Sequence, residues 1–178
     1  MIEGVASFVA WLGASLIVLA DGRRGLALGI ALVAAGLAVI TWLVAGPLAA
    51  GILAAGGAIA AARRFASGPG RWSVMPPGST PRLILCVASA LVALWIALGI
   101  TTGDSPALRF AVLAVIGLAG ARVLSSADAQ VQLTAAAILA LAIGAAAALG
   151  GANLPAYIVS AALAAAACWL PLRASRAA

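Results

Sequence analysis

The sequence predicts an all-α fold, a polytopic transmembrane helical bundle of about seven spans with the N-terminus outside and the C-terminus inside. The first observation behind this prediction is composition: 66% of the 178 residues are hydrophobic and 8% are charged. A typical globular chain is about half apolar and about a quarter charged. The second is a series of apolar stretches close to the 17–25 residues that cross a bilayer core. The third is the one-sided placement of arginine. We expect one integral membrane domain over residues 1–178.

Turn residues or charges separate the apolar stretches. The expected spans are 4–20, 25–45, 47–62, 82–101, 107–124, 130–149 and 154–170. A straight helix over the uncharged residues 25–62 would be about 57 Å long, nearly twice the hydrocarbon core. We therefore place a turn at Gly46-Pro47. The third span is then short, and a half-inserted segment is the alternative.

The first span has a second possible interpretation, because Val18-Leu19-Ala20 resembles the cleavage site of a signal peptide. Secretory signals, however, begin with a positively charged segment. The leader Met1-Ile2-Glu3 carries no positive charge. We therefore interpret residues 4–20 as a transmembrane helix.

Arginine placement sets the expected orientation. Positively charged residues accumulate in short loops on the cytoplasmic side of membrane proteins. With seven spans, only Arg109 is outside, and the inner side holds Arg23, Arg24, Arg63, Arg64, Arg71, Arg82, Arg122, Arg173 and Arg176. If the third span did not cross, residues 63–82 would lie opposite Arg23 and Arg24. The asymmetry favours seven spans, and the composition suits a bacterial inner (plasma) membrane.

Two segments of the chain share a pattern that suggests an internal duplication. Gly46-Pro47 opens the third span and Arg63-Arg64 closes it, while Leu154-Pro155 opens the seventh and Arg173 closes it. Spans one to three and five to seven would then be parallel repeats joined by span four. The low complexity of the sequence makes a chance match the alternative.

Small residues indicate how the helices pack. Hydrocarbon gives little hydrophobic force between helices, so close van der Waals contact across small side chains becomes important. The chain contains 20 glycines. We expect helix packing at Gly25, Gly29, Gly51, Gly56, Gly57, Gly117 and Ala121.

Several chemistries are excluded by residues that the chain lacks. It has no histidine, and all ten of its basic residues are arginine. Imidazole ligation of metals and Schiff-base chemistry on lysine are therefore impossible. Two cysteines, Cys86 and Cys168, are too few for an iron–sulfur cluster with four thiolate ligands. We predict free thiols at both positions and no catalytic, cofactor or metal site.

Charged and polar residues indicate no proton or cation pathway. The four acids lie at span ends or in loops: Glu3, Asp21, Asp104 and Asp128. We expect Arg109 and Arg122 to extend outward at the ends of the fifth span and to pair with Asp104 and Asp128. Hydroxyls inside spans should bond to their own helix backbone. Gln130 and Gln132 are two residues apart and should point to different faces.

The loop 63–82 is the main soluble segment and contains the candidate contacts with lipid or a partner. These are Arg63, Arg64, Arg71, Trp72 and Arg82. Basic residues next to the membrane are attracted to anionic lipid of the inner leaflet. We predict lipid anchoring, with docking to a partner subunit as the alternative. Topology accounts for the isoelectric point near 11.4, so nucleic-acid binding is not expected.

The expected function is that of a non-catalytic multi-pass membrane subunit. It would pack against or help assemble a larger membrane complex, respiratory or transport-related, through contacts with other membrane subunits or with itself. The alternative is a small homo-oligomeric transporter or lipid carrier, with a pathway lined by Ser, Thr and backbone. An enzyme acting on lipids would need an acid–base pair that the spans do not contain.

Overall fold

The computed structural model describes residues 1–67, 79–101, 103–151 and 153–170. Within these ranges the chain is an all-α bundle with seven α-helices and no strand, which confirms the predicted fold class. The helices are α1 (Ile2–Leu19), α2 (Arg23–Ala45), α3 (Pro47–Ala66), α4 (Thr80–Trp95), α5 (Pro106–Ser125), α6 (Ala129–Ala146) and α7 (Leu154–Trp169).

The helix bounds follow the expected spans with small differences. α3 continues to Ala66, four residues past the expected end, because Arg63 and Arg64 are helical rather than part of the loop. A helix of 20 residues is about 30 Å long, which favours a complete crossing over the half-inserted alternative. The π-helix η1 (Ile96–Ile100) extends α4, and the 3₁₀ helix η2 (Ala147–Gly150) extends α6.

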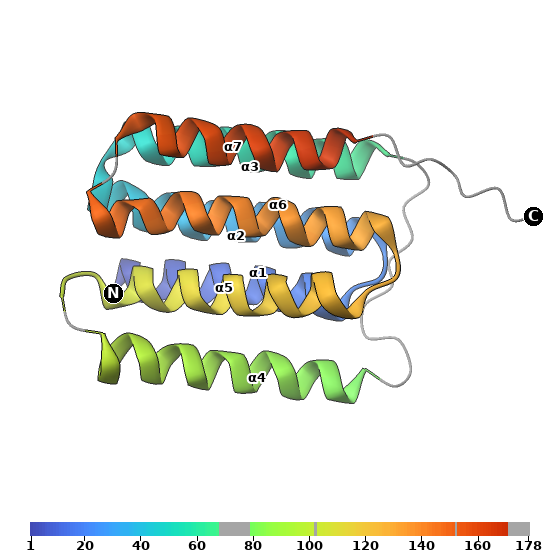
Figure 1. Ribbon diagram of the computed structural model, residues 1–178, viewed down its shortest axis with the longest axis horizontal. Helices are drawn as coiled ribbons and strands as arrows, with labels where there is room; N and C mark the ends of the chain where they lie inside the picture. The colour runs from blue at the N-terminus through green and yellow to red at the C-terminus, as the bar shows by residue number, and fades with distance from the viewer. Residues whose placement is uncertain (68–78, 102, 152, 171–178) are drawn as a thin grey trace, which may run out of the picture.

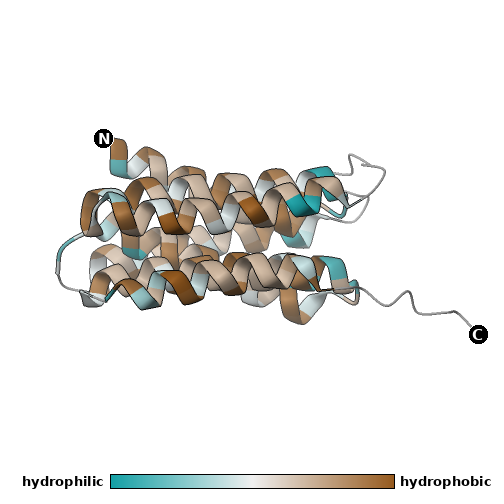
Figure 2. Ribbon diagram, turned by 90° about the horizontal axis from the view of Figure 1, so that it is seen from above, coloured by the Kyte–Doolittle hydropathy of each residue, from teal (hydrophilic) through white to brown (hydrophobic). Residues whose placement is uncertain are grey.

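Length and composition make this a multi-pass membrane protein. Six of the helices, α1 to α6 with the extensions of α4 and α6, are long and apolar enough to cross a bilayer. α7 is also apolar but has only 16 residues, about 24 Å of helix. Hydrophilic residues gather mainly at the helix ends, and most lie at the end where α1 meets α2 (Figure 2).

The helices form two layers of three, with α4 at one edge (Figure 1). α1, α2 and α3 pack side by side in one layer, and α5, α6 and α7 do so in the other. The layers stack helix for helix, with α1 on α5, α2 on α6 and α3 on α7. The helices α1 to α3 therefore have the same order and direction as α5 to α7, the two segments that the sequence suggests are repeats. Their common origin stays a prediction.

Arginines gather at one end of the bundle, as the sequence predicts. The six described arginines of the expected inner side lie at the α1–α2 end: Arg23, Arg24, Arg63, Arg64, Arg82 and Arg122. Arg109 lies in the first turn of α5, at the opposite end. Arg71, Arg173 and Arg176 are outside the described residues. The N-terminus and the last turn of α7 also lie at opposite ends (Figure 1), which agrees with an odd number of passes.

Three of the predicted packing glycines lie where helices approach closely. A Cβ atom on Gly57 would be 2.2 Å from the Cβ of Ala34, and one on Gly56 would be 2.6 Å from that of Ala161. At Gly29 a Cβ would be 2.4 Å from Ile17 Cγ1. These sites join α3 to α2, α3 to α7 and α2 to α1.

The other predicted packing positions differ from one another. Gly25 is buried and Ala121 is half-buried, but a Cβ on Gly51 would have nothing within 4 Å. At Gly117 its nearest neighbour would be Ser89 Oγ at an ordinary 3.7 Å. Gly51 therefore meets no neighbouring helix, whereas Gly117 is exposed but faces α4 across a groove.

The tightest contacts also include glycines that the sequence analysis did not select. A Cβ on Gly13 would be 2.7 Å from the backbone nitrogen of Val33, and one on Gly36 would be 2.5 Å from the backbone oxygen of Ala6. At Gly144 it would be 2.1 Å from Ser160 Oγ. At Gly13 and Gly36, the backbones of α1 and α2 are in direct contact.

α4 is the most exposed helix of the bundle. Only Cys86 and Ala93 are buried on it. Its main packing partners among the described helices are α5 and α1. Two polar contacts link it to α1: Trp11 Nε1 donates to the backbone oxygen of Cys86 at 3.2 Å, and Cys86 Sγ donates to the backbone oxygen of Ser15 at 4.0 Å. The structure contains both cysteines as free thiols, as predicted.

Candidate functional site at the arginine-rich end

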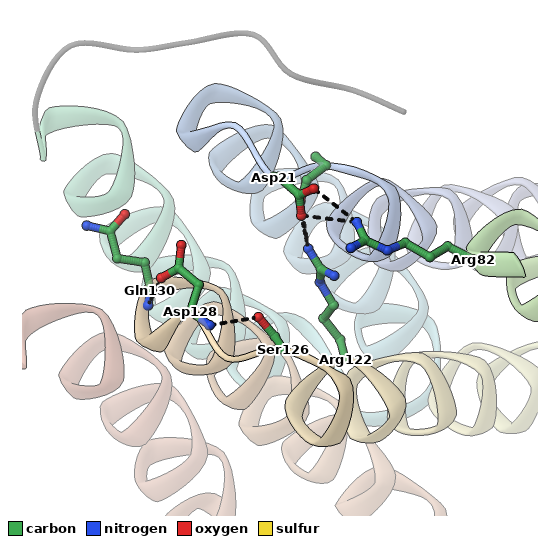
Figure 3. A network of polar contacts seen from close by, with 7 residues as sticks. Asp21, Arg82, Arg122, Ser126, Asp128 and Gln130 are labelled. Carbon is green, nitrogen blue, oxygen red and sulfur yellow. Dashed lines mark hydrogen bonds and ion pairs between the residues drawn. The ribbon is translucent and has the colours of Figure 1, made fainter. Parts of the chain in front are cut away.

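A three-residue ion cluster joins three segments at the arginine-rich end (Figure 3). Asp21, in the turn between α1 and α2, accepts hydrogen bonds from Arg122 of α5 and from Arg82 of α4. The Arg82 Nη1–Asp21 Oδ2 distance is 3.1 Å. The Arg122 side chain is only 3% exposed, whereas that of Asp21 is 40% exposed. The cluster is therefore half inside the bundle and half at its surface.

The position of Arg122 corrects the sequence analysis. We expected it to extend outward and pair with Asp128, but it is buried and pairs with Asp21. Because α5 stacks on α1, the last turn of α5 lies beside the α1–α2 turn, and Arg122 Nη2 also donates to the backbone oxygen of Ala20 at 3.2 Å. The guanidinium thus neutralises a carboxylate and satisfies a carbonyl left free at the end of α1.

The charge state of Asp21 follows from its surroundings. Partial burial raises its pKa, but hydrogen bonds and charge attraction from Arg122 and Arg82 outweigh burial and hold the pKa below its ordinary value. The aspartate is consequently ionised at neutral pH. One carboxylate between two guanidinium groups leaves the cluster with a net positive charge.

Asp128 and Arg109 have local roles instead of the expected ion pairs. Asp128 Oδ1 accepts from the backbone nitrogen of Gln130 at 2.7 Å and caps α6. Arg109 Nη2 donates to the backbone oxygen of Gly103 at 2.6 Å. Among the described residues, both salt bridges have Asp21 as their acid, so the expected Arg109–Asp104 and Arg122–Asp128 pairs are wrong.

The two glutamines serve different contacts, as their spacing predicts. Arg23 Nε donates to Gln130 Oε1 at 3.1 Å, and Arg23 Nη1 donates to the backbone oxygen of Ser67. Gln132 Nε2 donates to the backbone oxygen of Ser126 at 2.6 Å. Arg23 thereby links the beginnings of α2 and α6 to the end of α3.

The residues predicted to contact lipid or a partner have different surroundings in the structure. Arg63 lies on the ring of Trp169 in α7, with 4.9 Å from its guanidinium carbon to the ring centroid. Arg64 is buried, 3% exposed, and its Nη2 is 3.8 Å from Cys168 Sγ. Arg82 is engaged by Asp21. Arg71 and Trp72 lie outside the described residues.

Hydroxyls within the spans are mostly turned to their own helix. Ser7 donates to Gly4 O, Thr134 to Gln130 O, and Ser160 to Tyr157 O, at 2.7–2.9 Å. Ser15 and Thr41 differ from the prediction, because their buried hydroxyls have no partner among the described residues. They lie on α1 and α2, near opposite ends of the bundle.

Apolar grooves lie on the outside of the bundle between α6 and α7, between α2 and α3, between α1 and α2, and between α4 and α5. The first, about 660 Å³, lies between α6 and α7. The second, about 340 Å³, lies between α2 and α3 near the arginine-rich end, and Arg24 is part of its lining. These surfaces can bind apolar chains or helices.

Sequence reasoning missed the buried state of Arg122 and the groove beside Arg24. An arginine inside the last turn of an otherwise apolar span is a signal that could have indicated burial. The groove had no such signal, because it depends on which faces of α2 and α3 meet. Comparison of the chain with protein-family models, curated proteins and solved structures finds no match.

Proposed function

We propose that the chain is a non-catalytic multi-pass membrane subunit that packs against a transmembrane helix of another subunit in a larger membrane complex. Its place would be a bacterial inner membrane, with the arginine-rich end on the cytoplasmic side. The groove between α6 and α7 is the observation that carries this proposal.

The lining of this groove suits a helix better than lipid alone. Half of it consists of small side chains, and the remainder are larger apolar residues and a proline: Ala136, Ala140, Ala156, Ser160 and Ala167, then Leu139, Ile143, Pro155, Val159 and Leu163. Small residues let a neighbouring backbone approach closely, and close approach drives helix association in membranes. The volume of about 660 Å³ leaves room for several large side chains of a partner.

The polar contacts weigh against the transporter alternative. Ser7, Thr134 and Ser160 use their hydroxyls for their own helices, so these groups are not presented to a solute. At the centre of the bundle, glycine and alanine bring α2 and α3 within direct contact at Gly57 and Ala34. A pathway through this contact would need the helices to separate.

A site-specific cross-link tests the proposal. A photoreactive amino acid replaces Ile143, which is 57% exposed in the groove, or Leu91 of α4, which is 63% exposed. After illumination in native membranes, we expect Ile143 to give one discrete adduct with a different polypeptide. Leu91 should give mainly lipid adducts and serves as the control.

A groove-filling variant gives the second measurement. Ala140→Phe should release the partner in mild detergent, as seen by native gel and mass spectrometry, while Ala55→Phe on exposed α3 surface should not. If Ile143 cross-links only to a second copy of this chain and the purified oligomer conducts solute, the transporter alternative replaces the proposal. If Ile143 and Leu91 give the same lipid adducts, the groove holds no partner.

A further inference from the structure

The groove between α2 and α3 combines an apolar floor with a basic mouth. Its lining residues on α2 recur at helical spacing, and those on α3 lie in the last two turns: Arg24, Ala27, Leu28 and Ala31, then Ala61, Ala62 and Phe65. From Arg24 to Ala31 the groove extends about 10 Å along the helix. Phe65 is 64% exposed beside it, at the level of the arginine-rich end.

Charge at this end is poorly balanced on the side of the groove. Arg82 and Arg122 share Asp21, and Arg23 is bonded to Gln130 and Ser67. Among the described residues, Arg24, Arg63 and Arg64 make no salt bridge. Arg24 lines the groove, whereas Arg63 and Arg64 on α3 contact Trp169 and Cys168 of α7. Asp128 is engaged in capping α6.

We propose that this groove binds one anionic phospholipid of the inner leaflet. One acyl chain lies against Ala27, Leu28 and Ala31 on α2 and the facing alanines of α3. The phosphate of the headgroup pairs with Arg24, and Phe65 covers the glycerol region at the interface. The apolar lining and the charge of Arg24, which makes no salt bridge among the described residues, together favour an amphipathic anion whose charge lies at the membrane surface.

This site differs from the lipid contacts that the sequence predicts in the loop 63–82. It uses Arg24, which was outside that set, and it is formed by two helices rather than a loop. The inference does not depend on the proposed function, because the α2–α3 groove and the α6–α7 groove share no lining residue.

Native mass spectrometry of the detergent-purified full chain tests the site. The protein is offered equal amounts of phosphatidylglycerol and phosphatidylcholine of matched chain length. We expect one retained phosphatidylglycerol per chain in preference to phosphatidylcholine. Arg24→Gln should reduce that preference about five-fold, since one basic residue at an anionic surface contributes about 1 kcal/mol. Arg24→Lys should keep most of it.

A second pair of variants separates the groove from general surface charge. Ala31→Phe fills the groove from an exposed position and should abolish the retained lipid, while Ala55→Phe on exposed α3 surface should not. Circular dichroism checks that each variant is folded, and if Ala31→Phe is not, the Arg24 pair decides. Equal retention of both lipids by the native chain, or an unchanged preference in Arg24→Gln, overturns the proposal.

Discussion

Arg122 and Asp21 pair across 101 residues of sequence, and the guanidinium of Arg122 is almost fully buried while the carboxylate of Asp21 is partly exposed. The pair joins the end of α5 to the turn between α1 and α2. Since Arg82 of α4 binds the same carboxylate, Asp21 connects both three-helix layers and the edge helix. No other described residue links as many segments by charge.

Removal of the carboxylate should destabilise the bundle more than removal of the buried guanidinium. Asp21→Asn leaves Arg122 charged and buried without a counter-ion, which should cost about 2–3 kcal/mol. Arg122→Met leaves Asp21 partly exposed and still bonded to Arg82, so the loss should be smaller. Unfolding in detergent by sodium dodecyl sulfate titration measures both. Asp104→Asn, in an exposed connection at the other end, is the control, and equal losses for the two cluster variants would contradict this account.

Acid should weaken the same contact. The pKa of Asp21 is lowered in the folded protein, so the unfolded chain binds its proton first, at about pH 3.9. The stabilising contribution is therefore complete above that value and is lost as pH falls through the lower folded pKa. We expect the native chain to lose more stability than Asp21→Asn between pH 5 and pH 2, as measured by thermal unfolding. Parallel curves for the two proteins would exclude Asp21 as the source.

Addition of a methyl group should distinguish the glycines at helix contacts from those on outward faces. Gly57→Ala places a Cβ 2.2 Å from that of Ala34, so α3 must move away from α2, at a cost of about 1–3 kcal/mol. Gly51→Ala meets nothing within 4 Å on the same helix. There, better helix propensity should leave stability unchanged or raise it by up to about 1 kcal/mol. The measurement is unfolding in detergent, and a Gly51 variant as unstable as the Gly57 variant would count against the packing.

The indole group of Trp11 should contribute to the attachment of α4. Trp11→Phe keeps an aromatic ring, although a smaller one, and removes the donor to the Cys86 carbonyl. Polar contacts between membrane helices contribute about 0.6–1.7 kcal/mol. We expect faster hydrogen exchange along α4 and little change elsewhere. Trp42→Phe on α2, at a side chain that is 61% exposed, should leave α4 unchanged. Uniform acceleration in all helices would indicate general destabilisation instead.

The two ends of the bundle should lie on opposite faces of a membrane. Ala127→Cys lies in the connection between α5 and α6, and Asp104→Cys in that before α5; both positions are exposed. Because the native cysteines are buried, a membrane-impermeant maleimide should label the introduced thiols selectively. We expect Asp104→Cys to react in intact cells and Ala127→Cys only after lysis. Reaction of both in intact cells would contradict the orientation.

Helix number and placement were accessible from the sequence because they depend on local quantities. Span length, the turn at Gly46-Pro47 and the charged connections separate seven helices whatever their neighbours are. The gathering of arginines at one end follows from the number of spans, since the chain changes direction after each helix. The predicted ends of α3 and α6 were less accurate. A helix continues past a charge, as in α3, or into a 3₁₀ turn, as after α6, when no helix-breaking residue follows.

Which faces meet was decided only in three dimensions. These helices are apolar all round, so periodicity does not reveal a buried side, and Gly57 packs while Gly51 on the same helix does not. The choice of Asp21 over Asp128 as the partner of Arg122 depends on α5 stacking on α1. Composition and charge therefore determined a membrane bundle and its ends. Contacts between distant segments, which local sequence does not encode, determined the ion cluster and the grooves.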